Sequence, residues 1–192
     1  MIKRPKVLYA IQGTGNGHIA RARDLVPKFA HYADLDVVIS GNHCEVELGY
    51  PVMKSYQGLG FYFGKRGGID WGKTLRKNNI RKFIKEILSI DLTQYDYIIN
   101  DFEPVTAWAG KLKGLPVINL SHQAAVISRL SPKPSEKDRA GLTILKHYAP
   151  SNISFGFHFK CYDQKIYTPI IRDEIRALKP RQIITLRFTY PH

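Results

Sequence analysis

The stretch KVLYAIQGTGNGHIARA, residues 6–22, decides the fold class of this chain. Its first part is a short apolar run typical of a buried strand, and a glycine-rich turn then leads into a helical pattern at His18. Glycines let the backbone turn sharply and approach a ligand closely, and the first turn of a helix offers N–H groups to an anion. The stretch therefore predicts an α/β fold with a ligand site at its first strand-to-helix turn.

Apolar runs bounded by turn residues recur along the rest of the chain and predict further strands. Helical patterns separate these runs, and such alternation is typical of a parallel sheet that carries helices on both faces. The sequence therefore predicts a single Rossmann-like, doubly wound, mainly parallel domain over residues 1–180. The expected strands cover residues 6–12, 35–40, 58–63, 95–100, 115–120, 153–157 and 166–167.

Apolar stripes and capping residues predict the helices. The first begins near His18, and we expect Pro27 to kink it or end it early, because proline lacks an N–H and clashes with the preceding turn. Another carries five apolar residues at helical spacing that we expect to pack inward: Ile80, Phe83, Ile84, Ile87 and Leu88. The remaining helices are expected over residues 103–112, 135–148 and 172–178.

The composition excludes several classes of protein. With 44% hydrophobic and 23% charged residues, the chain of 192 residues is an ordinary globular mixture, and no apolar run approaches the roughly 20 residues of a membrane span. Cys44 and Cys161 lack CxxC spacing, which excludes disulfide scaffolds and zinc ribbons and predicts no metal site. Two reduced thiols are typical of a cytoplasmic protein.

The net charge of +13 is concentrated in one segment. Between Gly64 and Glu86, eight basic residues stand against two acidic ones, which leaves +6. A solvated charged face is the simplest interpretation, and peripheral contact with anionic lipid at the inner face of a membrane is the alternative. Because no RNA-recognition, KH or zinc-finger pattern accompanies the charge, we expect no specific nucleic-acid partner. The basic residues expected on the solvent side of the helix are Arg76, Lys77, Arg81, Lys82 and Lys85.

A histidine and an aspartate are the candidate catalytic residues. His18 ends the glycine-rich turn, and Asp101 follows a later apolar strand, so a parallel sheet places both at its carboxyl edge. An aspartate beside a histidine fixes its tautomer and stabilises the imidazolium, as a general base requires. The alternatives are a tight turn without a ligand and an Asp101 that caps the next helix. The glycine spacing is not G-x-G-x-x-G and the second strand ends in Ser40 instead of an acid, which disfavours a nicotinamide or flavin cofactor.

These segments carry a resemblance to a known family. Residues 6–22 resemble the N-terminal motif of GT-B glycosyltransferases, in particular enzymes similar to undecaprenyl-muramoyl N-acetylglucosaminyltransferase and the UDP-glucuronosyltransferases. NDFEPVTAWA, residues 100–109, resembles the acidic strand end and tryptophan-containing helix of that family, and NLSHQA, residues 119–124, fits the segment after the next strand. The likeness spans about the first 125 residues.

The resemblance implies a function and a set of site residues. GT-B enzymes have two Rossmann-like domains, of which the first mainly binds the acceptor and the second most of the nucleotide-sugar donor. The implied reaction transfers a hexosyl group from a donor such as a UDP-sugar, which is a substrate and not a cofactor, to a hydroxyl of a lipid- or glycan-linked acceptor. His18 would be the base and Asp101 its orienting partner. The implied substrate-binding residues are Gly13, Thr14, Gly15, Asn16, Gly17, Glu103, His122 and Gln123.

The chain departs from that family in length. One domain accounts for residues 1–180, so we expect residues 181–192 to be the truncated or frameshifted start of a missing donor-binding domain. The chain alone would then be inactive. The alternative is a natural single-domain protein whose last ten residues form an edge strand or a frayed tail.

A second nucleotide-binding motif offers a different function. GGIDWGKT, residues 67–74, satisfies the phosphate-loop pattern G-x-x-x-x-G-K-[ST] of NTPases and kinases. Asp70 counts against it, because a carboxylate inside the loop would repel phosphates, and so does the poor strand pattern before it. A phosphate-loop NTPase and a non-catalytic basic binding module stay as alternatives to the glycosyltransferase.

Overall fold

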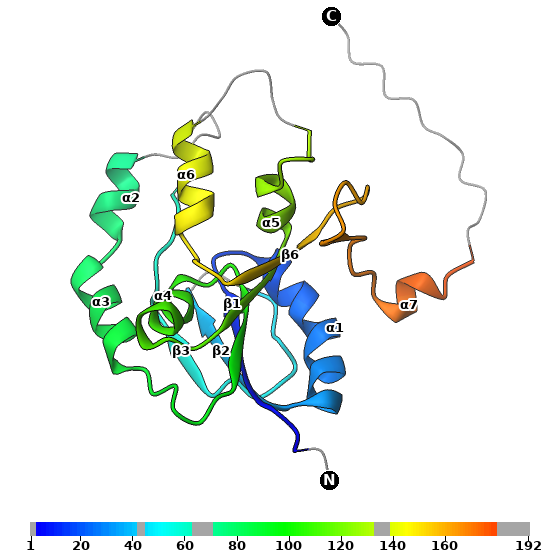
Figure 1. The fold of residues 1–192 in the computed structure, drawn as a ribbon, viewed down its shortest axis with the longest axis horizontal. Coiled ribbons are helices and arrows are strands. Elements are labelled where there is room, and N and C mark those ends of the chain that lie inside the picture. Colours follow the sequence, from blue (N-terminus) through cyan, green and yellow to red (C-terminus); the bar gives the residue numbers. More distant parts are fainter. Residues whose placement is uncertain (1–2, 42–44, 63–70, 133–138, 180–192) are drawn as a thin grey trace, which may run out of the picture.

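The strands of the computed structural model, which describes residues 3–41, 45–62, 71–132 and 139–179, join in one sheet (Figure 1). The sheet has seven strands in the order β3-β2-β1-β4-β5-β6-β7, and every pairing between neighbours is parallel. The strands are β1 (Lys6–Gln12), β2 (Asp34–Ser40), β3 (Lys54–Tyr56), β4 (Tyr97–Asp101), β5 (Val117–Ser121), β6 (Ile153–Phe157) and β7 (Ile166–Tyr167). The order reverses between β1 and β4, and the crevice at such a switch point is where ligands bind to open α/β sheets.

Helices cover both faces of the sheet, as Figure 1 shows for α1 on one side and α3 and α4 on the other. Alternate residues of β1 explain this arrangement. Leu8 and Ala10 belong to the apolar cluster shared with α3 and α4, whereas Tyr9 and Ile11 belong to the cluster shared with α1. The predicted doubly wound α/β fold is therefore confirmed. The helices are α1 (Asn16–Tyr32), α2 (Trp71–Lys77), α3 (Ile80–Ser89), α4 (Pro104–Lys113), α5 (His122–Ile127), α6 (Arg139–His147) and α7 (Asp173–Arg176).

Pro27 does not end the first helix early, which was one of the two effects expected of it. α1 continues to Tyr32, with the Pro27 side exposed to solvent. The neighbouring Leu25 and Val26 are buried, and Phe29 packs against the same cluster. Burial on both sides of the proline thus offsets the roughly 3 kcal/mol that a proline costs inside a helix.

The third strand lies earlier in the chain than the sequence predicts. It covers Lys54–Tyr56, and residues 58–62 are not a strand. Side chains, not a neighbouring strand, accept the hydrogen bonds of that segment: the Gly58 amide donates to Glu86, and the Gly60 amide donates to Asn78. The predicted tail, residues 181–192, lies outside the described residues.

The apolar stripe of α3 is only half buried, which corrects the expectation that all five residues pack inward. Phe83 and Ile87 are buried, but Ile80, Ile84 and Leu88 are 47%, 50% and 64% exposed. At about 100° per residue the exposed row is turned roughly 80° around the helix from the buried row, so it misses the contact with α4 and the sheet. The five basic residues expected on the solvent side are all exposed, as predicted.

Candidate functional site

The glycine-rich turn crosses the carboxyl edge of the sheet between β1 and α1. The amide of Gly13 donates a hydrogen bond of 2.6 Å to the Ser40 carbonyl, and a Cβ at Gly13 would lie 2.6 Å from Cγ2 of Ile39. Only glycine permits this close approach to β2. In contrast, a Cβ at Gly15 or Gly17 would meet nothing within 4 Å. Gly15 is the N-cap of α1 and makes no side-chain capping bond, so the start of the helix faces open space beside the turn.

His18 and Asp101 meet at this edge. His18 lies in the first turn of α1, Asp101 is the last residue of β4, and Nδ1 of the imidazole is 2.7 Å from Oδ1 of the carboxylate. The Asp101 side chain is fully buried, whereas 18% of the His18 side chain is exposed. The pair is therefore reached from solvent through the histidine.

Arg21 also binds Asp101, and the sequence reasoning missed it. Its Nε is 3.0 Å from Oδ2, and its Nη2 is 2.5 Å from Oδ1 and 2.7 Å from Oδ2. The guanidinium lies over the Phe157 ring, 5.4 Å from the centroid, and its side chain is 7% exposed. The signal in the sequence was its position: a residue three places after His18 lies on the same face of α1.

The charges around Asp101 determine its protonation. Complete burial acts to raise its pKa, but His18 and Arg21 outweigh burial and hold the pKa of Asp101 below its ordinary value. The carboxylate is thus ionised and accepts hydrogen bonds. The short contact to His18 then requires a proton on Nδ1, which leaves Nε2 as the ring nitrogen able to accept a proton.

Two aromatic rings, those of Phe102 and Tyr148, stack in sequence beside His18. The Phe102 ring lies nearly parallel to His18 at 6.5 Å, and Tyr148 lies 4.7 Å from Phe102. The Tyr148 hydroxyl donates to the Leu59 carbonyl and accepts from the Gln12 amide, and burial raises the pKa of Tyr148. Phe102 has a φ of 58°, in the left-handed region that non-glycine residues rarely adopt. Such strain between Asp101 and the next helix is typical of functional sites.

Glu103 caps α4, and its place among the substrate-binding residues stays a prediction. It is the N-cap of α4 and is fully buried. Its carboxylate accepts hydrogen bonds from the amides of Val105 (2.6 Å) and Thr106 (2.7 Å) and from the hydroxyls of Ser40 (2.5 Å) and Thr106 (2.6 Å). Each carboxylate oxygen thus accepts two hydrogen bonds within the protein. The alternative that Asp101 caps α4 is wrong, because Glu103 does so.

His122 and Gln123 begin α5, a helix that the sequence analysis did not predict, at the carboxyl end of β5. The His122 side chain contacts the Phe157 carbonyl at 3.0 Å through Nδ1, and the residue is exposed. Within the described part of the chain, the buried Oε1 atom of Gln123 has no hydrogen-bond partner. Both residues therefore offer polar atoms on the β5 side of the switch point.

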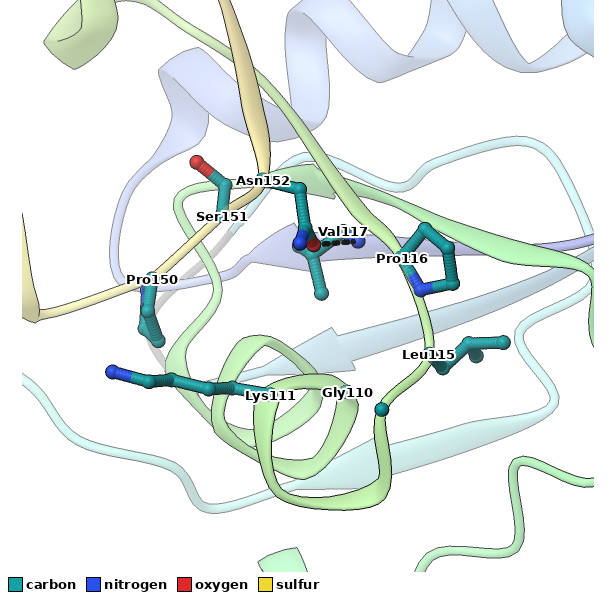
Figure 2. Close-up of a pocket in the computed structure, with 9 residues that line it drawn as sticks. Gly110, Lys111, Leu115, Pro116, Val117, Pro150, Ser151 and Asn152 are labelled. Carbon is teal, nitrogen blue, oxygen red and sulfur yellow. Dashed lines mark hydrogen bonds between the residues drawn. The ribbon is translucent and has the colours of Figure 1, made fainter.

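Two hollows flank the turn. One of about 310 Å³ is lined by residues of α1, α5 and the α7 segment, among them Gly17, Arg21 and His122. Another of about 60 Å³ contains Thr14 and Asn78. A third hollow, of about 240 Å³ and drawn in Figure 2, lies where Val117 begins β5 and Asn152 precedes β6, at the opposite edge of the sheet from His18. Only the first two belong to the candidate site.

In the part of the chain that the structure describes, the phosphate-loop motif lacks the preceding strand that an NTPase requires. Residues 67–70 of the motif lie outside the described residues, and the segment 58–62 that should supply the preceding strand is not one. Thr74 lies within α2 and is buried, and its hydroxyl accepts a hydrogen bond from the Tyr62 amide at 3.2 Å.

A metal site is not evident: among the described residues, no three His, Cys, Asp or Glu side chains gather closely enough to hold an ion.

Comparison with known proteins identifies the family. No curated protein sequence matches the chain. A family model described as "Glycosyl transferase family 1" matches residues 5–187, a span that includes every described strand and all the site residues discussed above. The parallel sheet with its switch point is also the architecture of one half of a GT-B enzyme. The chain therefore belongs to glycosyl transferase family 1 and is a glycosyltransferase.

Proposed function

We propose that this domain binds the acceptor and that His18 removes the proton from the acceptor hydroxyl. The observation that carries the proposal is the 2.7 Å contact between Nδ1 of His18 and Oδ1 of Asp101 at the switch point, beside the larger hollow. Nε2 takes the proton while the hydroxyl oxygen bonds to the anomeric carbon of the sugar. The bond from that carbon to the nucleoside diphosphate breaks, and the diphosphate leaves with the electron pair. Asp101 stabilises the imidazolium that results.

The donor is proposed to be a nucleotide-sugar, with UDP-sugars as the first class to test. The open space at Gly15 and Gly17 and the uncapped start of α1 suit its diphosphate. Thr14, Asn16, His122 and Gln123 would line the cleft. The family resemblance assigns most donor contacts to a second Rossmann-like domain, so we expect this domain alone to bind UDP-sugar weakly.

The experiment compares His18→Gln with His31→Gln, an exposed histidine at the far end of the same helix. In a complete two-domain enzyme that contains this domain, loss of the general base should reduce the rate of UDP release in the presence of acceptor by about 10²–10⁴-fold, whereas the control should be unaffected. Titration of the chain with UDP-sugar, ATP and duplex DNA, followed by NMR, separates the three function classes. Preferential binding of ATP would favour the NTPase, and equal transfer by His18→Gln and parent would refute the base.

We also propose that the acceptor is lipid-linked and that α3 contacts an anionic membrane surface. Ile80, Ile84 and Leu88 form an exposed row at i, i+4 and i+8, and Arg81 and Lys85 lie beside it. Apolar residues next to cations suit an anionic bilayer interface, where each Lys or Arg contributes about 1 kcal/mol. No described helix is long and apolar enough to cross a membrane.

Vesicle sedimentation tests this surface. Binding should require phosphatidylglycerol, weaken with salt, and fall in Leu88→Ser. Leu178→Ser is the matched control, because Leu178 is 66% exposed and Leu88 is 64% exposed, and it should bind like the parent. Binding that does not depend on anionic lipid would refute the proposal.

A further inference from the structure

We propose that Arg21 is a positioning residue that holds the Asp101 carboxylate in one orientation and aims it at Nδ1 of His18, so that His18 presents Nε2 to its substrate. The inference rests on the proposed function only for the identity of that substrate. The arrangement of the three side chains stands independently of it. Arg21 takes no proton in the proposed step, and it acts through Asp101 and through its contact with the His18 ring.

The geometry fixes the carboxylate in one orientation. Three contacts from the guanidinium reach both oxygens of Asp101, and Oδ2 accepts two of them, from Nε and from Nη2. The planar fork of arginine matches a carboxylate in this way, and lysine does not. Because Arg21 also packs on Phe157, the fork itself is held in place. Oδ1 is thereby directed at His18.

The electrostatic role follows from burial. A carboxylate with no exposed surface is costly unless a cation pairs with it. Arg21 supplies a permanent positive charge, so the buried Asp101 carboxylate has a cationic partner whichever proton His18 carries.

Arg21 also acts on His18 directly. Its Nη2 lies 3.1 Å from Nδ1 of the imidazole. Nδ1 already donates to Asp101, so this contact brings two hydrogen-bond donors together. The positive charge of the Arg21 guanidinium therefore disfavours a positive charge on the imidazole beside it. Among the described residues, Tyr9 is buried beside the cluster and His122 also interacts with it electrostatically. The charged side chains of Asp24 and Arg172 line the hollow next to Arg21, and in the described part of the chain neither forms an ion pair or hydrogen bond with Asp101, whereas Arg21 and His18 do.

The test reads the ring of His18 by NMR in the ¹⁵N-labelled chain, and it needs no activity. In the parent at pH 8 we expect the ring proton on Nδ1, where Asp101 accepts it. Arg21→Gln frees the carboxylate to turn and should lower the ratio of the Nδ1–H form to the Nε2–H form by about tenfold. Arg21→Lys keeps a cation beside Asp101 and should keep the proton on Nδ1. Arg23→Gln, at an exposed position two residues away, should change nothing.

The outcomes separate this inference from the proposed function. An unchanged His18 ring in Arg21→Gln, or equal changes in Arg21→Gln and Arg21→Lys, would show that Arg21 serves only stability and would overturn the inference. Where transfer is measurable, Arg21→Gln should lower kcat with little change in the KM of the acceptor, and should move the pH–rate profile. If the ring responds as expected but His18→Gln transfers sugar normally, only the proposed function fails.

Discussion

Asp101→Asn should destabilise the fold strongly at neutral pH, although it changes one atom. The carboxylate accepts three contacts from Arg21 and one from His18 in a fully buried position. An asparagine offers only one oxygen as an acceptor. Its NH₂ group would face N–H donors, from which it cannot accept a hydrogen bond. The Arg21 cation is then left buried without a charge partner. Breaking a buried ion pair in this way costs about 3–5 kcal/mol, which for a chain of this size lowers Tm by roughly 6–20 °C.

The pH dependence gives this prediction its sign. The pKa of Asp101 is lowered in the fold, so its stabilisation is fully present above the unfolded-state value of about 3.9 and is lost as pH falls through the lower folded value. The part of the difference in unfolding free energy between parent and Asp101→Asn that comes from the Asp101 charge should therefore shrink as pH falls below about 4.

Urea unfolding followed by circular dichroism measures both effects. Asp34→Asn is the control, because Asp34 forms an exposed ion pair with Lys6 at 3.1 Å, and such pairs contribute about 0–1 kcal/mol. A loss below about 1 kcal/mol in Asp101→Asn at pH 7 would refute the claim that the Arg21–Asp101–His18 cluster stabilises the fold.

Two further predictions concern the glycine-rich turn and the cap of α4. Gly13→Ala should destabilise the fold by about 1–3 kcal/mol, because its Cβ would overlap Ile39. Gly17 lies within α1, and a Cβ there would meet open space. Gly17→Ala should therefore stabilise the fold by up to about 1 kcal/mol, yet it should weaken UDP-sugar binding. Thermal unfolding and an NMR titration check the pair, and equal stabilities would contradict it. Glu103→Gln should lower the free energy of unfolding by about 1–3 kcal/mol, since its amide group would face a backbone N–H. The control is Glu47→Gln at an exposed position, which should change stability by less than about 0.5 kcal/mol in the same urea assay.

The sequence predicted the fold class because the signal for it is local. Each apolar run and each helical stripe reports on its own neighbours, and the parallel sheet follows from their alternation. The same locality explains the errors. Nothing near Gly58 indicates that the carboxylate of Glu86, 28 residues later, binds its amide in place of a neighbouring strand. The periodicity of α3 likewise identifies an apolar arc but not which row of that arc, Phe83 or Ile84, meets the sheet.

The candidate site divides in the same way. His18 and Asp101 could be placed together because each ends a strand or a turn at one edge of a parallel sheet, so topology alone brings them near. Topology does not say what a carboxylate does there. Asp101 and Glu103 are two residues apart and both fully buried, yet one faces His18 and Arg21 while the other caps α4. The left-handed φ of Phe102 between them turns the backbone and separates the two roles.

That turn links the strain at Phe102 to the site. A residue in the usual extended conformation would continue β4 and carry the chain past the switch point before α4 could start. The reversal at Phe102 instead ends the strand at Asp101 and lets the Glu103 carboxylate reach the amides of Val105 and Thr106 at once. It also places the Phe102 ring beneath His18. The buried bonds of Glu103 and the stack on Tyr148 over-determine this conformation, which is the condition under which a strained φ persists at a functional site. The residues on either side of Phe102 thus hold Asp101 in the position from which Arg21 and His18 can both bind it.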